Sequence, residues 1–211
     1  MKTDDLIRAL AADTERQRGL WQTLMLGLVP SLAVAVLGVW LVLGFREDLL
    51  TALVTPVSVA RIVLTGILGI AATRLALLLA RPEGGQTARL WPLAAVGSAA
   101  LGLLLWAYLT TPEDARQMAV VGKTMTTCLV AIPLLSVLPV ATLHYTLRHG
   151  ATTAPARAGF VAGLAGSGFS AAAYALHCTE DSPLFYVTWY GLAIMVVTLV
   201  STLIGARSLR W

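Results

Sequence analysis

The chain has 211 residues, of which 57% are hydrophobic and 12% are charged, and its mean hydropathy is +0.78. A soluble domain carries about 25% charged residues, so this composition excludes a soluble globular protein and indicates a polytopic membrane protein. Lys and Arg (15) outnumber Asp and Glu (11). Because most of the basic residues flank apolar stretches, we interpret the excess as a determinant of topology and expect no direct contact with nucleic acid.

Residues 1–20 precede the first apolar stretch and have the pattern of a short amphipathic helix. Thr3 can cap this helix, and Asp4 and Asp5 suit its positive N-terminal end. The apolar stripe comprises Leu6, Ile7, Leu10 and Ala11. So short a helix needs a partner. Two interpretations remain open: the stripe lies on the bilayer or the bundle, or a groove of a cytoplasmic protein receives it.

Six later stretches are apolar and about 20 residues long, as a helix needs in order to cross the hydrocarbon with its backbone groups paired. They therefore predict an all-α protein with six transmembrane helices, in which residues 21–211 form one transmembrane domain after the segment 1–20. The predicted spans are residues 21–44, 58–80, 90–110, 120–146, 156–177 and 184–206.

The basic residues divide ten to four between the two sets of loops. By the positive-inside rule both termini are cytoplasmic, and the loops at 45–57, 111–119 and 178–183 lie outside. This topology predicts a multi-pass membrane protein in contact with lipid. Arg74 and Arg61, near the two ends of the second span, are expected to extend their guanidinium groups to the membrane surfaces.

The spans themselves lack the polar groups that transport requires, because all eleven acidic residues fall in the N-terminal segment or in loops. Pro133 and Pro139 predict a kink in the fourth span. Small residues recur four apart at Gly159, Gly163 and Ser167 in the fifth span, which indicates close helix packing.

No catalytic motif occurs in the chain, so we expect no enzyme. His144 and His149 are predicted to be interfacial residues without chemistry.

Cys128 and Cys178 both map to the outer ends of predicted spans, and Cys178 stands beside His177, Glu180 and Asp181. The two thiols meet if the fourth span packs against the fifth or against the loop after it. A structural disulfide, a sensor of metal or oxidant, and inert buried thiols are all compatible with this placement. A regulatory metal would be bound by Cys128, Cys178 and His177, and no obligatory cofactor is expected.

Three motifs carry a resemblance to a known family: T-D-D-L-I-x-x-L-A at 3–11, F-R-x-D-L at 45–49 and H-C-x-E-D-S-P-x-F-x-x-x-W-Y-G at 177–191. With these motifs the chain resembles the NrsF-type family of six-helix membrane anti-sigma factors, negative regulators of an extracytoplasmic-function (ECF) sigma factor, SigF. The resemblance covers essentially the whole chain, and its most specific part is the run at 177–191.

Because the family is bacterial, the resemblance implies a multi-pass protein of the bacterial inner membrane. It implies that the cytoplasmic N-terminal segment holds an ECF sigma factor inactive there. The residues that would bind the sigma factor are Asp4, Asp5, Leu6, Ile7 and Leu10. It also implies that Cys128 and Cys178 sense heavy-metal or oxidative stress, with His177, Glu180 and Asp181 as neighbours. We expect the signal to change how the fourth and fifth helices pack, through the kink at Pro133 and Pro139.

Three other functions remain alternatives. A membrane thiol-disulfide oxidoreductase would pass electrons to quinone, although two cysteines are few for such an enzyme. A small permease or metal exporter would move a solute, and the absence of carboxylates in the spans counts against it. A structural bundle with an inert disulfide would leave the N-terminal segment without a partner.

Overall fold

The computed structural model describes residues 19–210, and all of the regular secondary structure in that part of the chain is helical. The predicted sigma-binding residues Asp4, Asp5, Leu6, Ile7 and Leu10 lie outside it. The long helices are α2 (Leu20–Gly38), α4 (Pro56–Leu79), α6 (Trp91–Thr110), α8 (Met125–Arg148), α9 (Pro155–Tyr174) and α10 (Pro183–Ser208). The shorter ones are the π-helix η1 (Val39–Leu43), α3 (Leu49–Ala52), α5 (Gly84–Thr87) and α7 (Glu113–Val121).

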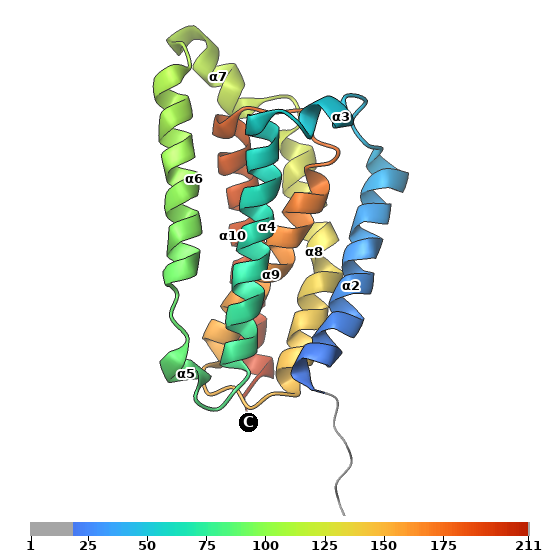
Figure 1. Cartoon of the computed structure of the whole chain (residues 1–211), viewed down its shortest axis with the longest axis vertical. Helices are drawn as coiled ribbons and strands as arrows, with labels where there is room; N and C mark the ends of the chain where they lie inside the picture. The colour runs from blue at the N-terminus through green and yellow to red at the C-terminus, as the bar shows by residue number, and fades with distance from the viewer. Residues whose placement is uncertain (1–18, 211) are drawn as a thin grey trace, which may run out of the picture.

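The long helices run alongside one another as a bundle (Figure 1), with α3 and α7 at one end and α5 and the C-terminus at the other. Proline occupies the first or second position of α4, α6, α9 and α10. These positions tolerate proline because their N–H groups have no partner within the helix, and the fixed φ of the ring suits the helix. The helix starts are thus encoded locally.

Helix α9 lies at the centre of the bundle and contacts α10, α4 and α8. Most of its residues are buried, and most of the buried ones are Gly, Ala or Ser. On α10, a Cβ added at Gly163 would lie 2.6 Å from the Cα of Thr198, and one added at Gly159 would lie 2.6 Å from the carbonyl oxygen of Ser201. The predicted close packing of the small-residue stripe is therefore confirmed, since only glycine permits these two approaches.

Five helical stretches among the described residues are long and apolar enough to cross a membrane. They are Leu20–Leu43, Pro56–Leu79, Trp91–Thr110, Glu113–Arg148 and Pro183–Ser208. Helix α9 coincides with the predicted fifth span and has 20 residues, but it is not among the five. Its surface meets other helices, so it is built from small residues and not from the large apolar ones that face lipid. The sixth span and the orientation of the termini stay predictions.

Two predicted spans differ in detail from the helices observed. The first ends in the π-helix η1, where the backbone bonding shifts by one residue. The fourth, predicted as 120–146, crosses a break at Gly122, whose φ of +58° ends α7 before α8 begins. Glycine takes this left-handed conformation without strain, and that is why the chain turns there. Pro133 and Pro139 both lie within α8.

Candidate functional site

A cluster of polar side chains and both cysteines occupies the end of the bundle where α3 lies (Figure 1). We call it the thiol–arginine cluster. It comprises Arg46, Asp48, Ser58, Arg61, Cys128, Tyr174, Cys178, Glu180 and Asp181. Its residues come from the loop after η1, the first two turns of α4, the first turn of α8, the last residue of α9 and the segment between α9 and α10. Segments far apart in the sequence therefore build one site.

The Arg46 guanidinium bridges two carboxylates. It donates to both oxygens of Asp48 at 2.7 and 2.8 Å and to both oxygens of Asp181 at 2.9 Å. Its Nη1 also donates to the backbone carbonyl oxygen of Cys178 at 3.2 Å. All of its donors thus point at acceptors in fork-like geometry, which is the strongest arrangement available to an arginine. The Arg46 side chain is 3% exposed.

Arg61 corrects the prediction made from the sequence, because its side chain is completely buried and does not extend to a membrane surface. Its guanidinium donates to the backbone carbonyl oxygens of Glu180 at 2.7 Å, Cys178 at 3.1 Å and Ala175 at 3.3 Å. It also lies 3.4 Å from Asp181. Acceptors on the segment after α9 replace water around the cation, so burial is tolerated. Arg74, on the same helix, is exposed.

Cys128 and Cys178 come together as predicted for packing between the fourth span and the segment after the fifth. Both are buried and neither forms a disulfide in this structure. The Cys128 Sγ lies 3.4 Å from the hydroxyl oxygen of Tyr174, and the Cys178 Sγ lies 3.9 Å from that of Thr124. Both cysteines also contact Tyr174, since the Cys178 N–H donates to the Tyr174 carbonyl oxygen at 3.2 Å. The site therefore presents a dithiol that is shielded from solvent.

The surroundings change the acidity of two groups in the segment after α9. The hydrogen bond from Cys128 lowers the pKa of the Cys178 thiol to about 6 against the opposing effect of burial, and the positive charge of Arg61 acts in the same direction. For Asp181, burial raises the pKa, but hydrogen bonds from Arg46 and Ser58 outweigh it, so the pKa lies below its usual value. A lowered pKa increases the fraction of thiolate, which is the form that reacts with oxidants and soft metals.

The predicted neighbours of the cysteines have structural partners of their own. The Nδ1 of His177 donates to the carbonyl oxygen of Gly44 at 2.9 Å, and an oxygen of Glu180 accepts the backbone N–H of Lys123 at 2.8 Å. Asp181 binds Arg46 and accepts the Ser58 hydroxyl at 2.7 Å. These side chains tie the segment after α9 to the loop after η1 and to the turn before α8.

Among residues 19–210 no group of three His, Cys, Asp or Glu side chains is arranged to hold a metal ion. The predicted set of Cys128, Cys178 and His177 does not form such a group. The ring of His177 instead packs against Tyr174, with centroids 5.7 Å apart, while its Nδ1 faces Gly44. Any metal chemistry at this site rests on the two thiols.

Four residues of the cluster were not predicted from the sequence to belong to it: Arg46, Ser58, Arg61 and Tyr174. Arg46 stands in the F-R-x-D-L motif together with Asp48, so that motif marks the ion pair. In the sequence, Arg61 is distinguished as a cation within a predicted span. Such a residue either extends to the membrane surface or is buried for a function. No sequence signal distinguishes Ser58 or Tyr174 from other residues of their helices.

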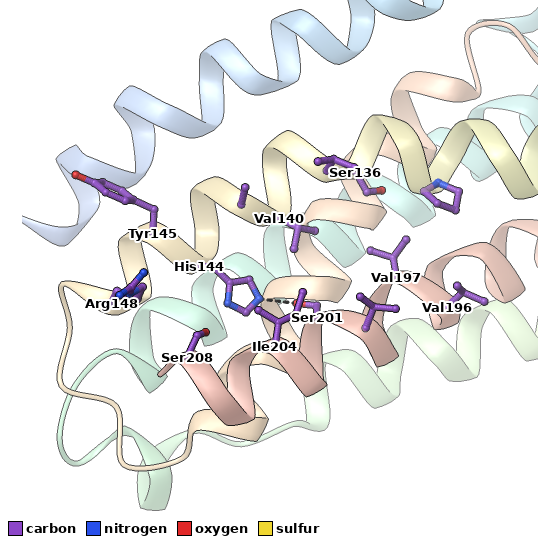
Figure 2. A pocket seen from close by; sticks show the side chains of 14 residues that line it. Ser136, Val140, His144, Tyr145, Arg148, Val196, Val197, Ser201, Ile204 and Ser208 are labelled. Atoms are coloured by element: carbon purple, nitrogen blue, oxygen red, sulfur yellow. Dashed lines mark hydrogen bonds between the residues drawn. The ribbon is translucent and has the colours of Figure 1, made fainter. Parts of the chain in front are cut away.

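His144 also departs from its prediction as an interfacial residue. It is buried between α8 and α10, where its Nε2 lies 2.8 Å from the Oγ of Ser201, as Figure 2 shows. The groove around it is otherwise lined mainly by aliphatic side chains such as Val140 and Val197, with Arg148 at one end. The cause is the contact between α8 and α10, which covers the imidazole. His149 is exposed.

Comparison with known proteins gives, along the whole chain, the family that the sequence motifs resemble. A family described as "Negative regulator of sigma F" matches residues 10–211. The anti-sigma-F factor NrsF of Caulobacter vibrioides (strain NA1000 / CB15N) is 35% identical over 216 residues, and the probable anti-sigma-F factor NrsF of Azospira oryzae (strain ATCC BAA-33 / DSM 13638 / PS) is 33% identical over 216 residues. Both alignments cover 100% of this chain and of the relative. No solved structure matches the chain. The chain belongs to the NrsF family, a family of regulators and not of catalysts.

Proposed function

We propose that this protein is a multi-pass inner-membrane anti-sigma factor that holds an ECF sigma factor through its cytoplasmic segment 1–20. Two relatives that align over their full length are named anti-sigma-F factors, and this supports the assignment. The apolar stripe of Leu6, Ile7 and Leu10 fits the groove of a partner protein. The proposed topology has six spans, with α9 as the central one and both termini in the cytoplasm.

The observation that carries the sensing part of the proposal is that Cys128 and Cys178 are both buried and share Thr124 and Tyr174 as neighbours. A peroxide can convert the two thiols to a disulfide: the thiols lose two electrons and two protons, and hydrogen peroxide becomes two molecules of water. A soft metal cation can instead bind both sulfurs as thiolates and release two protons. Either reaction pulls the Cys178 segment toward the first turn of α8.

The contacts of this segment suggest how the change reaches the cytoplasmic side. Arg46 donates to the Cys178 carbonyl oxygen, and the Gly44 carbonyl oxygen accepts a hydrogen bond from His177. Gly44 and Arg46 lie in the loop after η1, which continues α2. Helix α2 begins at Leu20, directly after the N-terminal segment. A shift of the Cys178 segment therefore acts on one end of the helix formed by α2 and η1, and the chain before the other end contains the proposed sigma-binding residues. This route through α2 replaces the kink in α8 as the proposed path.

The test of capture is co-purification of the sigma factor with the full-length protein in detergent. Leu6→Asp plus Leu10→Asp places two charges on the apolar stripe and should abolish recovery. Ala9→Asp plus Ala12→Asp adds the same two negative charges on the opposite face of the predicted helix and should leave most of the recovery unchanged. Equal recovery with both double variants would contradict capture by this stripe.

The test of sensing uses the same complex, treated with hydrogen peroxide or with Cd²⁺. The intact protein should release the sigma factor, and Cys128→Ser plus Cys178→Ser should retain it. The double variant must still capture the sigma factor before treatment, which shows that its fold is intact. Release from the double variant at the same rate as from the intact protein would refute sensing by these two cysteines.

A further inference from the structure

Both thiols of the thiol–arginine cluster are sealed from solvent, since Cys128 is 0% exposed and Cys178 is 1% exposed. A metal cation or an oxidant dissolved in water therefore reaches them only when part of the fold opens. Two partners of Cys178, Arg61 and Tyr174, are themselves buried. A third, Thr124, is only half-buried, and its hydroxyl oxygen lies 3.9 Å from the Cys178 Sγ. The cover of this thiol is therefore shallowest at Thr124.

The chain that leads to Thr124 consists of α7 and the turn 122–124, and it has little contact with the core. None of the residues 113–124 is buried. The main neighbour of α7 is α10, and α7 lies at the end of the bundle in Figure 1. Segments with few buried contacts open locally at a much lower free energy than the whole fold. We therefore expect this segment to detach before the helices around the thiols separate.

Two hydrogen bonds hold α7 and the turn 122–124 against the rest of the fold. The indole Nε1 of Trp189 donates to the carbonyl oxygen of Val120 at 2.7 Å. A carboxylate oxygen of Glu180 accepts the backbone N–H of Lys123 at 2.8 Å. Both bonds end on the backbone of the segment, so they fix the position of the chain itself. Neither bond is fully buried, so water can replace either partner when the segment detaches.

The side chains that hold the segment belong to the same sequence motif as Cys178. The run at 177–191 contains Glu180 and Trp189, and it also contains Phe185. A Cβ added at Gly122 would lie 2.5 Å from the ring of Phe185, so the turn rests directly on this ring. One motif thus carries a reactive thiol together with the residues that fix the cover over it.

We propose that α7 and the turn 122–124 form a lid over Cys178, that the hydrogen bond between Trp189 and Val120 latches it, and that metal cations and oxidants reach the thiol while the lid is open. The rate of reaction at the site is then set by the fraction of molecules with an open lid as well as by the chemistry of the thiol. This inference deepens the proposed sensing function and rests on it for its biological role. Its test measures access to the thiol and needs no sigma factor.

The test is alkylation of Cys178 by N-ethylmaleimide in the full-length protein in detergent, measured by mass spectrometry of the labelled peptide. At a pH well above the pKa of Cys178, which is about 6, the thiol is almost fully ionised and differences in rate report access. Trp189→Phe keeps an aromatic ring and removes the latch. Alkylation should become about fivefold faster, the factor that loss of one hydrogen bond gives. Trp106→Phe makes the same change at an exposed position of α6 and should leave the rate unchanged.

The second hydrogen bond of the lid is tested by two substitutions that both remove a negative charge. Glu180→Gln retains an oxygen that accepts the Lys123 N–H, so the alkylation rate should stay close to that of the intact protein. Glu180→Leu has a similar size and no acceptor, and it should accelerate alkylation about fivefold. Equal rates in the two variants would contradict a lid held by this contact. If Trp189→Phe fails to fold, this pair carries the test.

Reaction through unfolding of the whole protein is distinguished by Gly163→Ala, which disturbs the packing of α9 against α10 about two turns beyond Trp189. It should lower the unfolding temperature and leave the alkylation rate unchanged, and Trp189→Phe should do the reverse. Equal acceleration by the two variants would show that the thiol reacts through global unfolding and would overturn the lid. Acceleration by Asp181→Asn with none by Trp189→Phe would assign access to the segment after α9 and would also overturn it. In either case sensing would still be decided by sigma-factor release from Cys128→Ser plus Cys178→Ser.

Discussion

Arg61 on α4 donates from Nη2 to the backbone carbonyl oxygen of Cys178 at 3.1 Å, across 117 residues of sequence. The same oxygen accepts a hydrogen bond from Arg46 at 3.2 Å, so both of its lone pairs are used. The segment that carries the reactive cysteine is thus held by two cations from different parts of the chain. Any chemistry at Cys178 acts against these two attachments.

Arg61→Met should destabilise the protein strongly, by about 3 kcal/mol, because Asp181 loses one of its cations and buried carbonyl oxygens lose their donor. Thermal unfolding in detergent measures the effect. Arg74→Met, an exposed position on the same helix, should change stability by less than about 0.5 kcal/mol. Similar losses for the two variants would mean that the buried contacts of Arg61 contribute little.

Acid should weaken the attachment through Asp181. Its pKa is lowered in the folded protein, so its contribution to stability is present above about pH 3.9, the pKa of an unperturbed aspartate, and is lost as the pH falls through the lower folded value. Unfolding temperatures between pH 6 and pH 3 should therefore fall more steeply for the intact protein than for Asp181→Asn. Asp114→Asn, on exposed α7, should follow the intact protein. A curve for Asp181→Asn parallel to that of the intact protein would contradict this.

The thiol of Cys178 should react with N-ethylmaleimide with a pH midpoint near 6, because the hydrogen bond from Cys128 stabilises its thiolate. Cys128→Ala removes that donor and should shift the midpoint upward. Cys128→Ser retains a hydroxyl donor and should shift it less. Mass spectrometry of the labelled protein at a series of pH values measures the rates. An unchanged midpoint in Cys128→Ala would assign the low pKa to another cause.

Gly163→Ala should destabilise the bundle by about 1–3 kcal/mol, because the new Cβ would lie 2.6 Å from the Cα of Thr198 and 2.9 Å from the Cβ of Ser201. Gly102→Ala on α6 meets no atom within 4 Å. It should be neutral or stabilise by up to about 1 kcal/mol, since alanine favours a helix over glycine. Thermal unfolding of the two variants side by side separates tight packing from helix propensity.

The sequence predicted the helices well because their signals are local. Apolar length predicted the five membrane-length helices. In the structure, proline at the first or second position favours the starts of four of the long helices. The small-residue stripe at Gly159, Gly163 and Ser167 correctly indicated a closely packed helix. Hydropathy alone did not show that α9 is the central helix, because burial among helices and burial in lipid favour different side chains.

The candidate site, too, could be predicted from the sequence only in part. The sequence placed Cys128 and Cys178 at one end of the bundle and left their meeting conditional on how the helices pack. Only the tertiary structure shows that the two cysteines lie close together and that Arg61 is buried beside Cys178. It also shows that Arg46 binds both Asp48 and Asp181. Composition and periodicity describe each segment by itself, whereas a buried cation is stable only where acceptors from other segments surround it. For Arg61 those acceptors lie more than 100 residues away, and the fold alone brings them to it.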